Sequence, residues 1–367
     1  MKTLKAAFLT PIFPPDYCGM ANLVYYKDQW LRERGAYTSV ITFTPRKASK
    51  VPVNLIQQHV VRYKPYFRPP QGSVMLLMKD VISLCALLLG ALKDCDIVEV
   101  HGFSLFNLCL HMIMPLLKKQ RVIHVYKGND GWLYEGRNAV DFRRWMNRYA
   151  YTITNSFSLK EHLEQRNIRV DEVIWSEADP GMFYPEESRN DSPVLVTVKD
   201  LYKGCGVGTV LEALSLVNGL YPFTYCVVGD GPCRKDLEKQ SCDLRLAKSV
   251  KFLGAVEHGH VAEHVRKADI KILTSERESC PHGVIEAMMA GKPVIAHPVD
   301  DMPRILKESQ AGILTEQLDA YTLSQCIVAL LGDSERRKNL GKNAREFALN
   351  NFSSEIIFNR YRKVYEL

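Results

Sequence analysis

The sequence predicts an α/β protein built from two doubly wound domains in tandem. The chain has 367 residues, more than one hydrophobic core usually holds, which favours two domains of about 150 to 200 residues each. In both halves short apolar runs alternate with amphipathic segments, a rhythm typical of βαβ units around a parallel sheet. A stretch rich in proline, acidic residues and asparagine, residues 180–193, lies between the two halves. We therefore place the domains at residues 1–172 and 173–351.

The first half supplies the strands and helices of one such domain. Apolar runs predict strands at residues 4–10, 37–43, 96–100, 121–126 and 151–154. Between the first two lies the clearest helix, residues 21–34, which Gly35 closes because glycine readily adopts the left-handed conformation of a C-cap.

The second half repeats this pattern. Apolar runs predict strands at residues 194–198, 223–228, 250–253, 269–273 and 293–296. Helices are expected at residues 206–216, 232–240 and 258–267, and a final amphipathic segment covers residues 353–365. Doubly wound sheets bind ligands at the carboxyl ends of their strands, so two of them facing each other would form a cleft for a ligand.

One segment of the first half is unusually apolar. Residues 81–92, VISLCALLLGAL, are bounded by charged residues on both sides. Twelve residues fall short of the roughly 20 that a membrane span requires. We therefore expect a buried core helix here.

Charge is distributed unevenly along the chain. Residues 1–170 contain 24 Lys and Arg against 12 Asp and Glu, a net charge of +12, whereas residues 171–367 contain 24 against 29, a net charge of −5. In residues 59–70, HVVRYKPYFRPP, aromatic and basic residues are interleaved. An ordinary loop on a solvated basic surface is one explanation, and contact with an anionic membrane is the other. No recognised nucleic-acid-binding module accompanies the charge, so nucleic acid is the weakest alternative.

Three loops join strands to helices in a way that suits an anionic ligand. They are residues 11–22, 196–208 and 227–232, and they contain glycines, with two lysines in the second. Backbone amides at helix N-termini attract anions, and nearby lysines add positive charge. Glycine turns also serve as plain tight connections. None of the three loops matches a dinucleotide fingerprint or a Walker A loop.

Two carboxylates flank a predicted helix start in residues 277–296, RESCPHGVIEAMMAGKPVIA. Pro281 disfavours helix at the preceding residue, so we expect Glu278 in a loop and Glu286 in an early helical turn. Both would then lie at the mouth of the sheet, where they could accept hydrogen bonds from sugar hydroxyls. Capping of the helix N-terminus by an acidic residue is an equally good explanation on physical grounds.

With these residues in view, the segment that starts at Glu278 resembles the E-x7-E signature of retaining GT-B glycosyltransferases of family 4. The resemblance extends over nearly the whole chain. Further matching segments are Phe13-Pro14-Pro15 with Gly19, Lys127-Gly128-Asn129-Asp130, Lys199 with Lys203-Gly204, Gly229-Asp230-Gly231-Pro232 and Phe252-Leu253-Gly254. It implies the GT-B fold, with two Rossmann-like domains across a cleft and a C-terminal helix, residues 352–367, that returns to the first domain.

The resemblance also implies a role for each matching residue. Glu286 would bind the ribose hydroxyls of a nucleotide, and Glu278 would hold hydroxyls of the transferred sugar. Lys199 and Lys203 would neutralise the diphosphate, and preorganised charge of this kind stabilises an anionic leaving group. Backbone amides at Gly19 and in the segment Cys280, Pro281, His282 and Gly283 would support the phosphates and the sugar. Backbone near Gly254 and Ala255 would meet the base, and Gly229 belongs to the same donor-binding set.

Two departures from the family pattern concern the reacting centre and the donor domain. Lys127 stands where many members have a histidine that contacts the sugar, and we include it among the catalytic residues. Arg304 stands where a glutamate is usual after the last donor-domain strand. The motif Asp94-Cys95-Asp96 could suggest a metal, but it falls where a helix ends and a strand begins. We therefore expect no metal and no cofactor.

Together these features imply a retaining transferase that moves a hexose-type sugar from a UDP- or GDP-sugar to a hydroxyl of a lipid-linked or phosphorylated acceptor. The expected partners are the nucleotide sugar and the acceptor glycan or lipid. We expect a cytoplasmic protein, and peripheral contact with anionic lipid at the inner membrane face is a further hypothesis. The alternatives are another GT-B enzyme, such as a phosphorylase or a sugar-nucleotide epimerase, and a non-catalytic nucleotide-sugar-binding module.

Overall fold

The computed structural model describes residues 3–14, 19–43, 59–64, 74–102, 104–117, 119–126, 144, 147–187, 191–278 and 280–365. The chain separates into two compact units. The N-terminal unit comprises Met1–Trp175 together with Phe358–Leu367, and the C-terminal unit comprises Ser176–Ile357. The sequence predicted these boundaries slightly earlier, after residue 172 and after residue 351.

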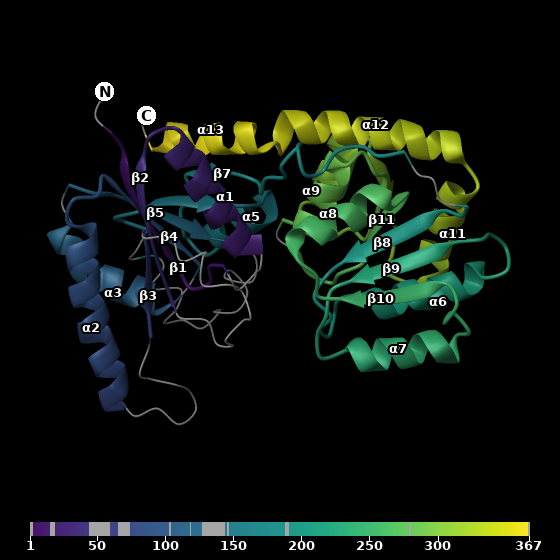
Figure 1. Cartoon of the computed structure of the whole chain (residues 1–367), viewed down its shortest axis with the longest axis horizontal. Coiled ribbons are helices and arrows are strands. Elements are labelled where there is room, and N and C mark those ends of the chain that lie inside the picture. The colour runs from purple at the N-terminus through teal and green to yellow at the C-terminus, as the bar shows by residue number, and fades with distance from the viewer. Residues whose placement is uncertain are drawn as a thin grey trace. The chain divides into compact units, whose positions relative to one another are not determined.

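The N-terminal unit is built on a seven-stranded parallel sheet of order β3-β2-β1-β4-β5-β6-β7 (Figure 1). Its strands are β1 (Lys5–Thr10), β2 (Tyr37–Phe43), β3 (Val60–Tyr63), β4 (Ile97–His101), β5 (Arg121–Tyr126), β6 (Tyr151–Thr154) and β7 (Glu172–Val173). The sequence predicted the three strands β2, β5 and β6 with these bounds, and β1 and β4 with a shift of one residue. It did not predict β3 or β7.

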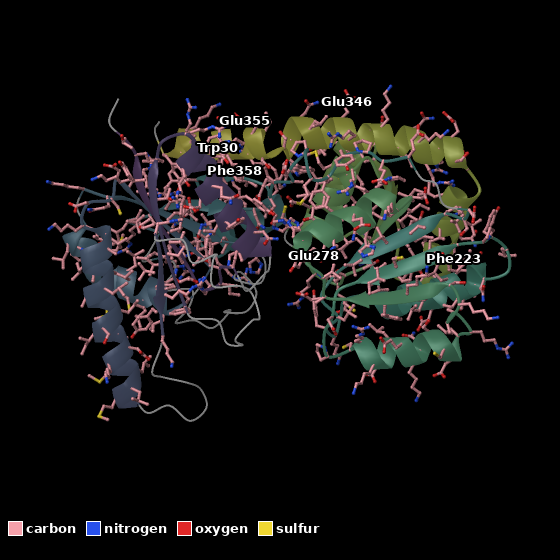
Figure 2. The ribbon with its side chains drawn as sticks, in the orientation of Figure 1. Trp30, Phe223, Glu278, Glu346, Glu355 and Phe358 are labelled. Carbon is pink, nitrogen blue, oxygen red and sulfur yellow. The ribbon has the colours of Figure 1, made fainter. Side chains whose placement is uncertain are left out.

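Helices cover this sheet because each has one apolar face. They are α1 (Gly19–Glu33), α2 (Val74–Leu92), α3 (Leu105–Ile113), the 3-10 helix η2 (Met114–Leu116), α5 (Phe157–Glu164) and α13 (Ser354–Val364). From Phe358 onward α13 belongs to this unit, and the ring of Phe358 packs on Trp30 of α1 with centroids 5.6 Å apart (Figure 2). The predicted return of the C-terminal helix is therefore a packed aromatic contact.

A buried charge cluster ties the C-terminus to β4. Glu99 forms an ion pair with Lys27 of α1, lies 2.5 Å from Nε2 of His101, and accepts a 2.5 Å hydrogen bond from the hydroxyl of Tyr365. Glu99, Lys27 and His101 have no exposed surface. Burial alone would raise the pKa of Glu99, but the charges of Lys27 and His101 outweigh it and hold that pKa well below its usual value.

Helix α2 differs from the prediction. It has 19 residues, and only 22% of the segment Met75–Leu92 is buried. Leu84, Leu88 and Leu92 form its buried face in the core of the unit. By length and composition alone the helix could cross a membrane. The expectation of a buried core helix is therefore right for one face and wrong for the other.

The basic and aromatic stretch at residues 59–70 is also only partly a loop. Val60–Tyr63 forms the edge strand β3, which pairs in parallel with β2. The Arg62 side chain donates a hydrogen bond to the carbonyl of Pro14. The rest of the stretch, residues 65–70, lies outside the described residues.

The C-terminal unit contains a six-stranded parallel sheet of order β10-β9-β8-β11-β12-β13 (Figure 1). Its strands are β8 (Val194–Val198), β9 (Thr224–Val228), β10 (Val250–Gly254), β11 (Ile270–Leu273), β12 (Val294–Ala296) and β13 (Gly312–Leu314). The strand order reverses between β8 and β11. Ligands of doubly wound sheets bind beyond the carboxyl ends of the strands at such a point.

Helices pack on both faces of this sheet. They are α6 (Val207–Val217), α7 (Arg234–Asp243), α8 (His258–Lys267), α9 (His282–Met289), α10 (Met302–Ser309), α11 (Ala320–Leu331) and α12 (Ser334–Asn351). Helices α6, α7 and α11 share one core cluster with Ile270 and Ile272 of β11. Because side chains alternate along a strand, Lys271 points to the opposite face.

Candidate active site

Three loops meet at the carboxyl ends of β8, β9 and β11. Two glycines permit their close approach. A Cβ on Gly206, whose φ is +78°, would lie 1.9 Å from the carbonyl oxygen of Thr274, and a Cβ on Gly229, whose φ is +139°, would lie 1.9 Å from that of Lys199. No other residue fits such contacts and such φ angles without strain. The loop glycines therefore bring the lysine loop of β8 against the loops of β9 and β11.

Lys199 and Glu278 form an ion pair at this edge of the sheet. The Nζ of Lys199 donates to Oε1 of Glu278, and the two side chains are 14% and 15% exposed. Burial lowers the pKa of Lys199, but the charge of Glu278 outweighs it, so the pKa stands above its usual value. Figure 2 shows Glu278 where the strands of the C-terminal unit end. The predicted sugar-binding glutamate and the predicted phosphate-binding lysine are thus in direct contact.

The backbone around Glu278 is held by the loop after β12. Asp300 accepts a 2.5 Å hydrogen bond from the backbone N–H of Glu278, and its own φ is +47°. That left-handed backbone conformation is uncommon outside glycine, although aspartate tolerates it better than most residues. The loop that departs from the family pattern therefore supports the glutamate through a carboxylate.

Glu286 is paired with a histidine from the neighbouring helix. The Nε2 of His258, the first residue of α8, lies 2.7 Å from Oε1 of Glu286, and Glu286 is 7% exposed. Burial lowers the pKa of His258, but the hydrogen bond and charge of Glu286 prevail and raise it. The pair is accordingly a charge-assisted hydrogen bond, the stronger class of such bonds.

Helix α9 begins between the two glutamates without a carboxylate cap. Its N-cap residue is Pro281, no side chain caps it, and its first turn contains no acidic residue. The backbone N–H groups of Val284 and Ile285 donate to the carbonyl of Pro281. Capping by Glu278 or Glu286, the alternative that the sequence left open, is therefore wrong.

The other predicted site residues form no hydrogen bond or ion pair with the side chain of Glu278 or Glu286 in the described part of the chain. Lys203 lies in an exposed turn before α6, and Ala255 is exposed after β10. The backbone N–H of Gly229 donates to the carbonyl of Gly254 over 2.8 Å. Gly19 is the first residue of α1 in the N-terminal unit. The structure thus brings Lys199, Gly229, Gly254 and the α9 residues into one unit, while Lys127 lies outside the described residues.

Cys280, Pro281, His282 and Gly283 form the entry to α9. Cys280 and Pro281 are buried, whereas His282 and Gly283 are half-buried at the first turn. The Sγ of Cys280 accepts a 3.4 Å hydrogen bond from the backbone N–H of Ser176. These contacts hold the N-terminus of α9 at the carboxyl end of β11, where helix amides can face an anion.

Three polar residues that contact or face the glutamates were not predicted from the sequence. They are His258, Lys271 and Asp300. His258 and Asp300 come from segments that are 28 and 22 residues away from the glutamates they contact. Lys271 carried one signal, since it is the single charged residue in the strand IKIL.

Asp96 of the Asp-Cys-Asp motif and His124 of β5 both have structural partners. Asp96 of the Asp-Cys-Asp motif accepts a 3.0 Å hydrogen bond from the backbone N–H of Lys5. His124 lies 3.1 Å from Asn107 and 3.2 Å from the carbonyl of Gly102, in the core of the N-terminal unit. Within the described ranges no three His, Cys, Asp or Glu residues gather as metal ligands do.

Comparisons with known proteins agree with this geometry. Residues 17–174 match the model of the family "Glycosyltransferase Family 4", and residues 182–347 match that of "Glycosyl transferases group 1". N-acetyl-α-D-glucosaminyl L-malate synthase from Bacillus anthracis is 28% identical over 91% of this chain and 90% of its own length. An uncharacterised glycosyltransferase from Methanocaldococcus jannaschii is 29% identical over 74% and 77%.

Solved structures share the fold over the whole chain. Sucrose-phosphate synthase from Thermosynechococcus elongatus superposes with a TM-score of 0.80 at 19% identity, covering 99% of this chain and 98% of the other. HepE from Anabaena, solved with UDP-glucose, gives 0.78 at 19% identity, covering 99% and 100%. The two matched family models, the relatives and the fold lead to one conclusion: this chain is a glycosyltransferase of family 4 with the two-domain GT-B fold.

Proposed function

We propose that the protein is a retaining glycosyltransferase that transfers a hexose-type sugar from a UDP- or GDP-sugar to an acceptor hydroxyl. The observation that carries this proposal is the Lys199–Glu278 ion pair beside the uncapped N-terminus of α9. It combines a cation, a carboxylate and helix amides at one edge of the sheet. The cation and the helix amides can bind a diphosphate, and the carboxylate can accept a hydrogen bond from a neutral sugar hydroxyl.

The chemistry follows from the leaving group. When the glycosidic bond to the diphosphate breaks, negative charge develops on the departing phosphate oxygen. Lys199, Lys203 and the amides of α9 would stabilise that charge, and no metal or other cofactor is required. The acceptor hydroxyl would attack from the face that the diphosphate leaves, pass its proton to the departing phosphate, and so retain the anomeric configuration.

The two glutamates would position the donor. Glu278 would accept hydrogen bonds from hydroxyls of the transferred sugar with the oxygen that Lys199 leaves free. Glu286 would bind the ribose hydroxyls while His258 holds its other oxygen. Catalytic groups held by neighbouring side chains give more precise alignment than groups on mobile side chains.

Relatives support a nucleotide-diphosphate donor and leave two acceptor classes. The Anabaena structure contains UDP-glucose. The Bacillus relative is named for glycosylation of L-malate, a small acid. By contrast, a Campylobacter jejuni relative, 32% identical over 32% of this chain, is named for a diphospho-undecaprenol acceptor. A human relative, 22% identical over 84% of this chain, is named for phosphatidylinositol.

An exposed apolar surface on the N-terminal unit favours the lipid-linked class. On α2 it consists of Met75, Met78 and Ile82, which are 75%, 59% and 68% exposed. On α3, which packs against α2, and on the following η2, the exposed apolar residues are Leu108, Met112 and Leu116, which are 39%, 56% and 68% exposed. We call these six residues the α2–α3 surface. A group of large exposed apolar side chains on two packed helices is uncommon in a protein that contacts only water.

The charges around the α2–α3 surface suit an anionic bilayer. Lys79 and Lys93 are exposed on either side of the apolar segment at residues 81–92. The single acidic residue of α2, Asp80, is buried against the hydroxyl of Tyr63. Apolar side chains flanked by lysines bind anionic membrane interfaces. We therefore propose peripheral contact at the cytoplasmic membrane face and an acceptor carried by a lipid.

The donor assignment is tested by a thermal-shift screen of UDP-, GDP- and ADP-sugars, followed by measurement of slow donor hydrolysis without acceptor. Stabilisation grows with ligand concentration over Kd, so the screen ranks donors directly. We expect one UDP- or GDP-sugar to lead and to be hydrolysed. Binding without hydrolysis or transfer would favour a non-catalytic module, and release of sugar phosphate on adding inorganic phosphate would indicate a phosphorylase.

The membrane assignment is tested by flotation with vesicles of phosphatidylcholine alone or mixed with phosphatidylglycerol. We expect the wild type to float with the anionic vesicles and Ile82→Glu to lose flotation. Leu220→Glu is the matched control, because Leu220 is also 68% exposed but lies in the C-terminal unit. Equal flotation of all three proteins, or none by the wild type, would contradict contact through the α2–α3 surface.

A further inference from the structure

Lys271 is a fully buried lysine in the central strand β11. Its side chain has no exposed surface. Its Nζ has no hydrogen-bond partner among the described residues. Lys271 pairs through its backbone with Val196 of β8 and Val294 of β12, so it lies next to the reversal of strand order. An unpaired ammonium in such a place is costly, because burial removes its hydration without replacing it.

The side chain reaches the first turn of α9. A Cβ on Gly283, the second residue of α9, would lie 3.3 Å from Nζ of Lys271 and 3.3 Å from the carbonyl oxygen of Val198. The missing side chain of Gly283 therefore leaves the ammonium directly beneath the helix start. Only one glycine separates it from the half-buried turn that faces the end of the sheet.

The charged groups around Lys271 all belong to the proposed donor site. They are Glu286 on α9, Glu278 in the preceding loop and Lys199 after β8, and His258 of α8 adjoins them through Glu286. Burial lowers the pKa of Lys271 to about 7, although both carboxylates oppose this effect. Each glutamate already has another basic partner, so Lys271 is not needed to neutralise either one.

Packing alone does not require a cation at this position. A methionine has nearly the same length and volume, and it would fill the space without the cost of a buried charge. What the lysine adds is positive charge beneath a helix N-terminus, where the helix dipole is itself positive. This arrangement is unfavourable in the empty site and becomes favourable when an anion binds there.

We propose that Lys271 is a positioning residue of the donor site, whose ammonium supports the bound nucleoside diphosphate from beneath Gly283 and whose amine takes up protons from solvent as that anion binds. The inference rests on the proposed donor site and adds a third cation to Lys199 and Lys203. The protons come from water or buffer, and the amine nitrogen supplies the electron pair. Donor affinity should therefore weaken as pH rises.

Isothermal titration calorimetry with UDP and GDP tests the proposal, using whichever nucleotide binds the wild type more tightly. Titrations at pH 8 in two buffers of different ionisation enthalpy give the number of protons taken up. The variant Lys271→Met removes the charge and keeps the volume. Lys292→Met is the matched control, because Lys292 is a buried lysine of the same unit whose Nζ donates to the carbonyl of Glu186.

We expect Lys271→Met to weaken nucleotide binding about tenfold at pH 6.5 and less than about twofold at pH 9.5, the size of one charge interaction across several ångströms. Wild type and Lys292→Met should take up more protons at pH 8 than Lys271→Met. Protons exchanged by the nucleotide itself are the same for all three proteins, so they cancel in this comparison. A melting temperature of Lys271→Met equal to or above that of the wild type would show that the fold does not need the charge.

Equal affinity and equal proton uptake in wild type and Lys271→Met would overturn the role of Lys271 and leave the proposed function standing. If neither nucleotide bound the wild type, both proposals would fail. If Lys271→Met did not fold, a pH series on the wild type would decide the matter. Nucleotide affinity that did not fall between pH 7 and pH 9 would overturn the inference.

Discussion

The Nε2 of His258 lies 2.7 Å from Oε1 of Glu286, so the first residue of α8 holds the glutamate of α9 that we expect to bind the ribose. Glu286 is nearly buried, and a buried carboxylate requires a hydrogen-bonding or charged partner. His258 supplies that partner from a segment that no motif marks. The contact therefore connects the pH dependence of stability with the proposed nucleotide site.

The His258–Glu286 pair should stabilise the fold more at low pH than at high pH. Glu286 raises the pKa of His258 above its unfolded value, although burial opposes this. The stabilisation is thus fully present below the unfolded pKa of about 6.5 and is lost as pH rises through the folded pKa. We expect wild type to exceed His258→Gln by about 1 to 2 kcal/mol at pH 6, measured by urea unfolding, and by less at pH 9. A difference that grew with pH would contradict the pairing.

Lys199 should matter much more for turnover than Lys203. Lys199 is in contact with Glu278 and is mostly buried, whereas Lys203 is exposed, where water screens its charge. We expect Lys199→Met to lower kcat/KM for donor hydrolysis by about 100-fold, as loss of a preorganised charge does, and Lys203→Met by about tenfold or less. A larger loss in Lys203→Met would place the diphosphate nearer the exposed turn.

A double-mutant cycle separates the ion pair from the single residues. Because Lys199 and Glu278 are in direct contact, the effects of Lys199→Met and Glu278→Gln on kcat/KM should not add. We expect the double variant to be less impaired than the product of the two single effects by about tenfold. Additive effects would mean that the two side chains act on the donor independently.

The sequence predicted the central strands of both sheets and the edge strand β10, but it missed the other three edge strands, β3, β7 and β13. β2, β5, β6 and β8 are apolar runs long enough to recognise. β7 and β13 have only two and three residues, too few for periodicity to be visible. For α2, composition identified an apolar helix but could not show which face the sheet covers, because that depends on tertiary packing.

The candidate site could be predicted as far as the motif residues extend. Pro281 correctly placed Glu278 in a loop and Glu286 in a helix. The partners His258 and Asp300 could not be predicted, because their contacts depend on how α8 and the loop after β12 pack against α9. The burial of Lys271 could not be predicted for another reason, since lysine is almost never fully buried without a partner.

The buried Glu99 cluster should control how firmly the C-terminus is attached to the N-terminal unit. Tyr365→Phe removes a hydroxyl that donates to Glu99 over 2.5 Å, and we expect a loss of about 1 to 3 kcal/mol because the acceptor is charged and buried. Glu99→Gln leaves Lys27 without its ion-pair partner and should cost about 3 to 5 kcal/mol. Urea unfolding followed by tryptophan fluorescence measures both. Tyr321→Phe, at a tyrosine that is 69% exposed, is the control and should change stability by less than about 0.5 kcal/mol.

Gly283 should tolerate a methyl group poorly, and the cost should depend on Lys271. An added Cβ would lie 3.3 Å from Nζ of Lys271 and 3.4 Å from Cβ of Val198, which is tight contact without severe overlap. We expect Gly283→Ala to cost about 1 kcal/mol, because the buried lysine has little room to move away. In the Lys271→Met background the destabilisation by Gly283→Ala should be smaller, because the end of the methionine side chain is uncharged and more adaptable. Gly206→Ala gives the upper limit, because its Cβ would lie 1.9 Å from the carbonyl oxygen of Thr274 at a φ of +78°, and it should cost more than about 3 kcal/mol. Thermal unfolding of the four variants measures these costs. If Gly283→Ala were equally destabilising with lysine or methionine at residue 271, the ammonium would not lie against the first turn of α9.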